Sequence, residues 1–300
     1  MSTSCGHSDL VSSITLSDAE RDSGLFPAEK LSAAIQLFEK QGFLRLVNVF
    51  TPEYMQHINK YYGQRYKSFL NGTSQHDLRP LFTVDVEGPF NDEVFYANPH
   101  VYSFVSSFLG DKCILGALSS VASYPGAPDQ HLHRDTQAIF GIGPDDYTID
   151  KEVPVYAMTV LIPLVDCTLE TGCTKVWPRS HFTSNDSEAL KIDSLDPEVF
   201  VGSVLITNSK LLHRGGANLS DRLRPLVYMT YHRSWFRDFY GYESRPPVNV
   251  TNFEYRKIPD NHKHMFSWTR NTYKYIRYKA MAKRLLPWFI KKKVGKIVRG

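Results

Sequence analysis

The sequence predicts a mainly β domain whose flanking helices gather towards the N-terminus. Apart from a stretch at about 272–290, helical spacing of apolar residues is confined to residues 27–109, before the first long β-prone run. Residues 113–232 then contain a succession of β-prone runs with no helical segment between them. Strands that follow one another in this way favour an antiparallel sandwich or barrel over βαβ units.

The N-terminal helices are predicted from stripes of apolar residues, from N-terminal capping residues and from glycines that end a helix. Apolar residues on one stripe and a terminal glycine predict a helix over 27–42, and a β-prone run predicts a strand over 43–49. At 51–70, an N-cap threonine, a proline and an acidic residue open a second helix. A shorter helix is predicted near 98–109.

The later β-prone runs are the expected strands of the core, at 113–124, 131–140, 155–165, 174–178, 200–207 and 224–232. Together with the helices they predict one domain over residues 26–260. Residues 1–25, rich in Ser, Thr and Asp and without periodicity, are expected to be a mobile tail. Residues 261–300 are expected to form a basic C-terminal helical extension, with its helix at about 272–290.

The net charge of +4 conceals an asymmetry along the chain. Residues 261–300 contain twelve Lys and Arg and no Asp or Glu, whereas the first 260 residues carry 23 basic and 31 acidic side chains. The extension is predicted to be a solvated helix, with peripheral docking to an anionic membrane surface as the alternative. No nucleic-acid-binding motif accompanies the charge, so a specific nucleic-acid partner is not expected.

The four cysteines, Cys5, Cys113, Cys167 and Cys173, match no C-x-x-C pair or zinc-ligand spacing. We therefore expect free thiols in a reducing compartment. The polar N-terminus lacks the features of a signal peptide, and no apolar run reaches the roughly 18 residues that a membrane span needs. These features, with an ordinary composition of 42% hydrophobic and 22% charged residues, predict a soluble cytoplasmic enzyme.

The segment His131-Leu132-His133-Arg134-Asp135 carries the strongest chemical signal. On a strand, His133 and Asp135 project from the same face, so two metal ligands can converge from one segment. His213, after a later apolar run, would supply a second imidazole. Two histidines and one carboxylate leave coordination positions open, as in non-haem Fe(II) oxygenases, whereas a structural zinc site takes four protein ligands. His131 shares the face and is the alternative to His133.

Arg224 begins a predicted strand eleven residues after His213. If His213 ends the preceding strand, a hairpin would bring Arg224 back beside it. A guanidinium there can grip a carboxylate through two parallel hydrogen bonds, as a chelating oxoacid with a distal carboxylate would require. Arg222 is the competitor for this role.

Motifs around this constellation occur in a characteristic order: Gln41-Gly42-Phe43, Tyr124-Pro125-Gly126, Leu161-Ile162-Pro163-Leu164, Glu170-Thr171-Gly172-Cys173, Val176-Trp177-Pro178-Arg179-Ser180-His181 and His213-Arg214-Gly215-Gly216-Ala217-Asn218. In this order and spacing, over roughly residues 30–235, they resemble the phytanoyl-CoA dioxygenase (PhyH-like) family. The resemblance implies a double-stranded β-helix core (jelly-roll, cupin-like).

The resemblance also implies that His133, Asp135 and His213 bind Fe(II), and that Arg224 binds the C5 carboxylate of 2-oxoglutarate. It implies O2 as co-substrate, release of succinate and CO2, and ascorbate as an optional reductant for the iron. The expected activity is oxidation, foremost hydroxylation, of an unactivated C–H bond in a small organic, natural-product or lipid-like substrate. Related halogenases have Gly or Ala at the carboxylate position, so the intact Asp135 favours hydroxylation.

Two departures from the family pattern stand out. Arg179 replaces the glycine of a P-G-S-H turn. Gly215 stands where some members have a serine that also touches 2-oxoglutarate, so that hydrogen bond is absent or supplied elsewhere.

Three further residues, Gln137, Thr174 and Asn218, complete the candidate cofactor-binding set. The aromatic run at 235–240 is either a lid over an apolar substrate or part of a satellite core. Two alternative functions remain at this stage: a non-catalytic metal-binding β-barrel that serves as scaffold or sensor, and a cupin-type metalloenzyme that needs no oxoacid. Arg224 argues against both.

Overall fold

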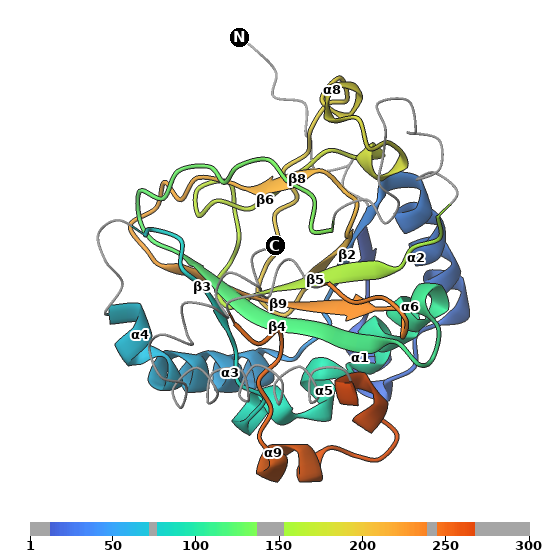
Figure 1. Ribbon diagram of the computed structural model, residues 1–300, viewed down its shortest axis with the longest axis vertical. Coiled ribbons are helices and arrows are strands. Elements are labelled where there is room, and N and C mark those ends of the chain that lie inside the picture. The colour runs from blue at the N-terminus through green and yellow to red at the C-terminus, as the bar shows by residue number, and fades with distance from the viewer. Residues whose placement is uncertain (1–12, 72–76, 137–152, 239–244, 268–300) are drawn as a thin grey trace, which may run out of the picture.

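The computed structural model describes residues 13–71, 77–136, 153–238 and 245–267 (Figure 1). Its centre is a seven-stranded sheet in the order β1-β2-β7-β5-β9-β4-β3, antiparallel except where β1 pairs with β2. The strands are β1 (Ser13–Thr15), β2 (Phe43–Val47), β3 (Leu81–Thr83), β4 (Ile114–Ser123), β5 (Ala157–Pro163), β7 (Val204–Asn208) and β9 (Arg224–His232). A second, two-stranded sheet pairs β6 (Thr174–Val176) with β8 (His213–Gly215).

Helices cover one face of the large sheet, and β6 and β8 lie over the other (Figure 1). The α-helices are α1 (Asp18–Ser23), α2 (Ala28–Gln41), α3 (Pro52–Arg65), α4 (Lys67–Asn71), α5 (Glu93–Tyr96), α6 (Pro99–Leu109), α8 (Asp186–Ala189) and α9 (Asn252–Lys257). Short 3-10 turns occupy Gly88–Asn91, Ser180–Phe182 and Lys263–Phe266. The prediction of an antiparallel β core with flanking helices is confirmed.

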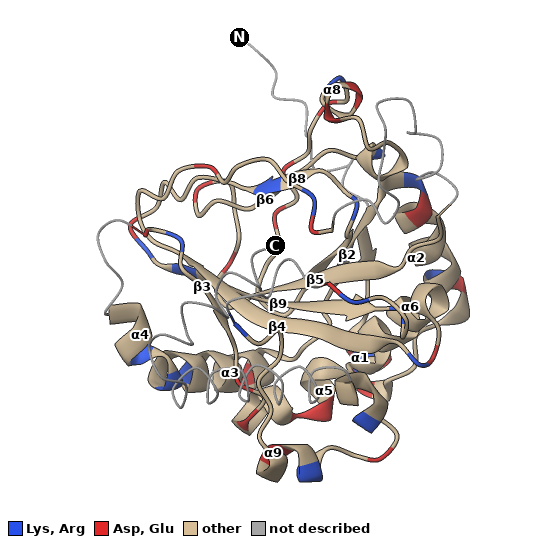
Figure 2. Cartoon of the chain, viewed as in Figure 1, with Lys and Arg blue, Asp and Glu red and all other residues tan. Residues whose placement is uncertain are grey.

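Alternation along β9 separates the protein core from a cavity. Val227, Met229 and Tyr231 are buried in the main hydrophobic core, where they pack with residues of the helices. Successive side chains of a strand point to opposite faces, and the alternate residues Arg224, Leu226, Tyr228, Thr230 and His232 line the cavity between the two sheets. Strands β4, β5 and β9 are almost free of charge along their length (Figure 2), and Arg224 is the exception.

Aromatic side chains fasten the helices to the sheet. Phe38 of α2 is 1% exposed and packs edge-on against Phe104 of α6, with 5.3 Å between the ring centroids. The Phe108 ring completes a triangle with them, 5.1 Å from Phe38 and 5.4 Å from Phe104 between centroids. Burial of one such ring contributes roughly 1.5–3 kcal/mol, so this layer holds the sheet as a rigid floor for the cavity.

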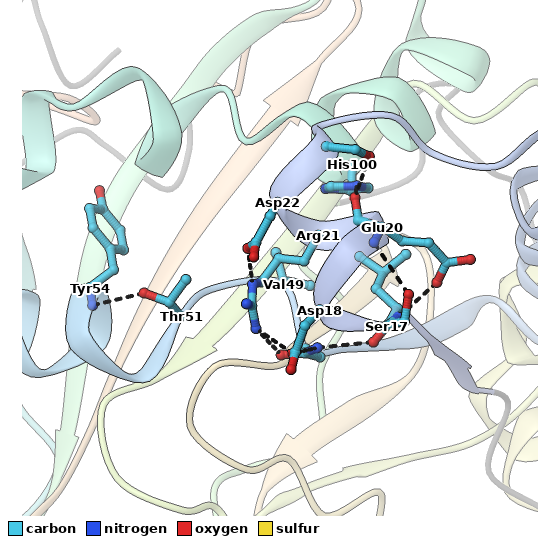
Figure 3. Close-up of polar contacts among 12 residues, drawn as sticks. Ser17, Asp18, Glu20, Arg21, Asp22, Val49, Thr51, Tyr54 and His100 are labelled. Atoms are coloured by element: carbon cyan, nitrogen blue, oxygen red, sulfur yellow. Dashed lines mark hydrogen bonds and ion pairs between the residues drawn. The ribbon is translucent and has the colours of Figure 1, made fainter.

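Residues 13–25 include β1 and α1, and the predicted mobile tail is therefore wrong for these residues. Strand β1 pairs with β2, and α1 begins with a capping box in which the Ser17 hydroxyl accepts from the Glu20 amide and the Glu20 carboxylate accepts from the Ser17 amide (Figure 3). Arg21 binds Asp18 and Asp22, both at 2.8 Å. The Ser- and Asp-rich composition that predicts a mobile tail is also the composition of a capped helix N-terminus.

Three predicted boundaries also need correction. A strand over 131–140 was expected, but residues 131–136 form only one isolated bridge, His133 to His213, and then bend. The helix from residue 51 breaks at Tyr66, and α4 follows. The domain continues past residue 260, because Met265 and Phe266 are fully buried in the main core. The predicted helix at 272–290 lies outside the described residues.

Within the described residues, no helix is long and apolar enough to cross a membrane. Cys113, Cys167 and Cys173 are buried and carry free thiols, as predicted.

Candidate metal centre

The small sheet and the preceding loop bring His133, Asp135 and His213 together. Their ligand atoms all lie within 4.8 Å of one another, the only such cluster of metal-binding side chains within the described part of the chain. The His133 and His213 rings are 4.3 Å apart between centroids, and Nε2 of His213 is 3.5 Å from Asp135 Oδ1. Reciprocal backbone hydrogen bonds of 3.0 Å between His133 and His213 fix this approach.

Both histidines are oriented in the same way by the main chain. The Nδ1 of His133 is 2.9 Å from the carbonyl oxygen of His131, and the Nδ1 of His213 is 2.9 Å from that of Leu211. A carbonyl oxygen only accepts, so each Nδ1 carries the proton and each Nε2 keeps its lone pair. Metal-binding histidines are commonly held in this way through their second nitrogen.

Burial lowers the pKa of His133, and the neighbouring His213 lowers it further. The imidazole is therefore neutral near pH 7, the form that a metal requires. The third candidate ligand is also oriented, because the Thr159 hydroxyl donates to Asp135 Oδ2 at 2.6 Å. The donor set of two imidazoles and one carboxylate fits Fe(II) with coordination positions left open.

The cluster opens onto a cavity of about 310 Å³ between the two sheets. Besides the three candidate ligands, its lining includes the inward face of β9, Thr159 and Leu161 of β5, Thr174 of β6, Gln130, Asp238 and Arg245. The cavity is large enough for a small organic molecule.

Arg224 is a buried cation at one end of this cavity. The residue is 3% exposed, its Nε donates to the carbonyl of Thr171 at 3.3 Å, and its Nη2 has no hydrogen-bond partner among the described residues. Burial lowers the pKa of Arg224. A buried guanidinium without a carboxylate partner is costly, so this end of the cavity is suited to an anionic ligand.

The other end of the cavity carries neutral polar groups. Oγ1 of Thr230 and Nδ1 of His232 are buried, and neither has a hydrogen-bond partner within the described residues. Burial lowers the pKa of His232 to about 3, so its ring is neutral. Gly116 makes room for the ring, since a Cβ there would lie 2.2 Å from it, and Phe236 packs against it at 5.1 Å.

The remaining predicted residues differ in whether they line the cavity. Thr174 lines the cavity, whereas the Arg222 side chain is 74% exposed and no longer competes with Arg224. His131 also lines the cavity but lies outside the three-residue cluster. Gln137 lies outside the described residues. Of the aromatic run, Trp235 is 61% exposed and Phe236 packs against Tyr156, while residues 239 and 240 are not described.

The expectation that Asn218 binds the co-substrate needs correction. Asn218 is fully buried, and it is absent from the cavity wall. Its amide nitrogen donates to the carbonyls of Ser123 and Arg222, and its amide oxygen accepts from the Ser220 amide and hydroxyl. All its hydrogen-bonding positions are thus used to build the turn that leads into β9.

Sequence reasoning missed Thr159, His232 and Gln130, which line the cavity. Thr159 and His232 lie in predicted strands on the inward face, but their neighbours belong to distant strands. A polar residue in an otherwise apolar strand, as at Thr159, is the one signal that could have been used.

The sequence matches the profile of the phytanoyl-CoA dioxygenase (PhyH) family over residues 38–226. The chain belongs to this family. The match covers both candidate histidines, Asp135 and Arg224.

Several curated proteins are similar to this PhyH-family chain. Dioxygenase FUM3 of Gibberella moniliformis is 24% identical over 169 residues, which cover 56% of this chain and 54% of that protein. Dioxygenase trt7 of Aspergillus terreus is 24% identical over 222 residues, 69% of this chain and 74% of that protein. A 2-aminoethylphosphonate dioxygenase from an uncultured bacterium is 24% identical over 152 residues, 46% and 53% respectively. The chain spans about half the length of the first and third of these relatives.

Solved structures share the fold at low sequence identity. The non-haem α-ketoglutarate-dependent epimerase SnoN from nogalamycin biosynthesis matches with a TM-score of 0.56 and 15% identity, covering 76% of this chain and 98% of that one. The carbocyclase SnoK of the same biosynthesis matches with a TM-score of 0.51 and 14% identity, covering 70% and 85%. The likeness confirms the double-stranded β-helix that the sequence resemblance implied.

Proposed function

We propose that the protein is an Fe(II)- and 2-oxoglutarate-dependent dioxygenase that hydroxylates an unactivated C–H bond of a small organic, natural-product or lipid-like molecule. One observation carries the proposal: a single cavity is lined by the His133, Asp135 and His213 cluster and by Arg224, whose Nη2 has no hydrogen-bond partner among the described residues. The names of the similar dioxygenases, and a SnoN structure in complex with Fe3+ and α-ketoglutarate, support it.

In this proposal the chain supplies ligands, orientation and shielding from water. His133 and His213 offer Nε2, and Asp135 offers a carboxylate oxygen that Thr159 holds in place. When bound, Fe(II) and 2-oxoglutarate supply the activation of O2, and the oxoacid is converted to succinate and CO2. Arg224 binds the C5 carboxylate, which orients the oxoacid towards the metal.

The position of Thr159 shows where the metal cluster lies along the length of β9. Thr159 pairs with Thr230 across the sheet and hydrogen-bonds Asp135, so the metal cluster lies near the level of Thr230. Arg224 is six residues away along β9, and His232 is two residues beyond Thr230 in the other direction. The oxoacid therefore occupies the Arg224 side, and the primary substrate the side with the neutral groups of Thr230 and His232.

The proposal is tested by anaerobic titration of the purified chain with Fe(II) and 2-oxoglutarate, with the weak visible charge-transfer band of the chelate as readout. The wild type is expected to show the band, and Asp135→Ala to lose iron binding. Arg224→Gln should weaken 2-oxoglutarate binding and leave iron binding intact. Absence of the band in the wild type would refute the proposal and favour a metal-binding protein without an oxoacid.

Turnover provides the next distinction. A dioxygenase of this type releases succinate from 2-oxoglutarate in an O2-dependent manner, whereas a non-catalytic scaffold does not. Once a substrate is found, hydroxylation predicts a product that has gained one oxygen atom derived from O2. A product without that oxygen would leave the cofactor assignment standing and overturn hydroxylation.

A further inference from the structure

We infer that Arg79 is a second cation of the co-substrate site, which acts with Arg224 to select oxoacids that carry a distal carboxylate. The inference rests on the proposed function, because it concerns the oxoacid end of the same cavity. Arg79 comes from the segment before β3, far in the sequence from every residue of the metal cluster.

The backbone of two loops holds the Arg79 guanidinium in place. Its Nη2 donates to the carbonyl oxygen of Pro128 at 2.5 Å and to that of Gly216 at 3.0 Å. The first loop leads to the metal-binding segment, and the second follows β8. These anchors fix the guanidinium between the two chain segments that carry the candidate ligands.

The other terminal nitrogen of Arg79, Nη1, lies beside Gly215 of β8, and Arg79 is not itself a residue of the cavity lining. Gly215 and His213 are two residues apart on one strand, so their side-chain directions share a face. A Cβ on Gly215 would lie 2.8 Å from Arg79 Nη1 and 2.7 Å from the amide oxygen of Gln130. Gln130 and Gly215 both line the cavity. Because Gly215 has no side chain, the guanidinium of Arg79 can occupy this space. It supplies there a hydrogen-bond donor that glycine lacks.

Arg79 and Arg224 act on each other as like charges. Burial lowers the pKa of Arg79 to about 10, and Arg224 is the next largest cause of the lowering. Both side chains remain protonated at neutral pH, and each has a buried terminal nitrogen without a partner in the described residues. The one acid that acts on Arg79, Asp129, is paired with Arg214 at 2.7 Å.

The buried Arg224 and the half-buried Arg79, which repel each other, favour an anion. Bringing a carboxylate to them replaces a repulsion by two attractions in a medium of low dielectric constant. A monocarboxylate oxoacid that chelates the metal leaves this pair uncompensated. Preference for a dicarboxylate over its methyl-ended analogue is therefore the property that Arg79 is expected to strengthen.

The test compares two ligands on the full, Mn(II)-loaded chain by calorimetry: 2-oxoglutarate and 2-oxopentanoate, which ends in a methyl group. Arg79→Gln should raise the Kd of 2-oxoglutarate at least about 10-fold and leave that of 2-oxopentanoate within twofold. Gly215→Ala should give the same loss of preference, because its Cβ displaces Nη1 while both backbone anchors remain. Lys175→Gln, which removes a cation already paired with Asp196, is the matched control and should change neither Kd.

The outcomes are distinguishable. If wild type binds 2-oxoglutarate and both variants keep its preference, Arg79 is not part of the site. Equal weakening of both ligands shows a structural role only, and also overturns the inference. If metal-loaded wild type binds neither ligand, the proposed function fails. Should Arg79→Gln not fold, Gly215→Ala alone decides, since it leaves Arg79 in the chain.

Discussion

The hydrogen bond from Thr159 to Asp135 makes the strongest single prediction about the metal centre. Thr159 is 4% exposed, and its hydroxyl lies 2.6 Å from Asp135 Oδ2. Thr159→Val keeps the β-branched shape and removes only this donor. Loss of a hydrogen bond to a charged group is worth about 1.5–3 kcal/mol, and loss of a metal ligand's outer partner typically weakens metal binding 10–100-fold. The two estimates agree, so metal affinity should fall by about that factor.

Anaerobic titration with Fe(II), or with Co(II) as a spectroscopic substitute, measures the change. Ser120→Ala is the matched control, because Ser120 lies on the helix-facing side of β4 and bonds the Tyr62 hydroxyl at 2.8 Å. This variant should lower the free energy of unfolding by about 1–3 kcal/mol and leave metal affinity unchanged. Metal binding by Thr159→Val within twofold of wild type, or an equal loss in Ser120→Ala, would refute the reasoning.

Three further outcomes are expected. Gly116→Ala should lower the free energy of unfolding by about 1–3 kcal/mol in urea denaturation, because the new Cβ meets the His232 ring. Gly63 is an exposed helical position with no neighbour, so Gly63→Ala should raise the free energy of unfolding by about 0.5–1 kcal/mol. Burial lowers the pKa of His181 to about 4 and of His232 to about 3. The unfolded chain, with histidine pKa near 6.5, then binds more protons, so stability contributed by these rings is complete above that value and is lost as pH falls through each folded pKa. Each ring adds a slope of about 1.4 kcal/mol per pH unit, and His232→Asn should reduce the measured slope by that amount. Asn218→Ala should lower the thermal midpoint and leave the Kd of 2-oxoglutarate unchanged; an unchanged midpoint with weakened binding would reinstate its role in the co-substrate site.

The strands were predictable where a β-prone run is long and is bounded by turns. The run from Arg224 to His232 was predicted with the bounds that β9 has. The 131–140 run was not, because a period of two in the sequence does not ensure a partner strand. The main chain of His133 pairs with that of His213, and this single bridge suffices to place the candidate ligand.

The relation of His213 to Arg224 shows where sequence reasoning fails. A hairpin was expected, yet β8 pairs with β6, and β9 pairs with β4 and β5. The chain crosses from one sheet to the other between them, and both side chains still reach one cavity. Which strand pairs with which is decided by long-range packing that local pattern does not contain.

At Arg179 the backbone conformation departs from the local preference of the residue. The family pattern has glycine there, and Arg179 adopts a left-handed conformation with φ of +68°, at a cost of about 1–2 kcal/mol for a residue with a side chain. Neighbouring bonds maintain the turn: the Trp177 amide donates to the Leu212 carbonyl, and the Ser180 hydroxyl accepts from the Leu212 amide. Because these bonds position the strand that carries His213, tertiary structure overrides the local preference.

Stability and chemistry are carried by alternate residues of the same strand. Along β9, Val227 and Met229 fill the core beneath the sheet, whereas Tyr228 and Thr230 face the cavity above it. Ligand-facing residues are thus held by a backbone whose other face is packed at core density. This packing limits the movement of the residues that must hold a reacting pair in position. The buried charge of Arg224 at the end of β9 carries a desolvation cost, which the bound co-substrate, in the proposed function, would compensate.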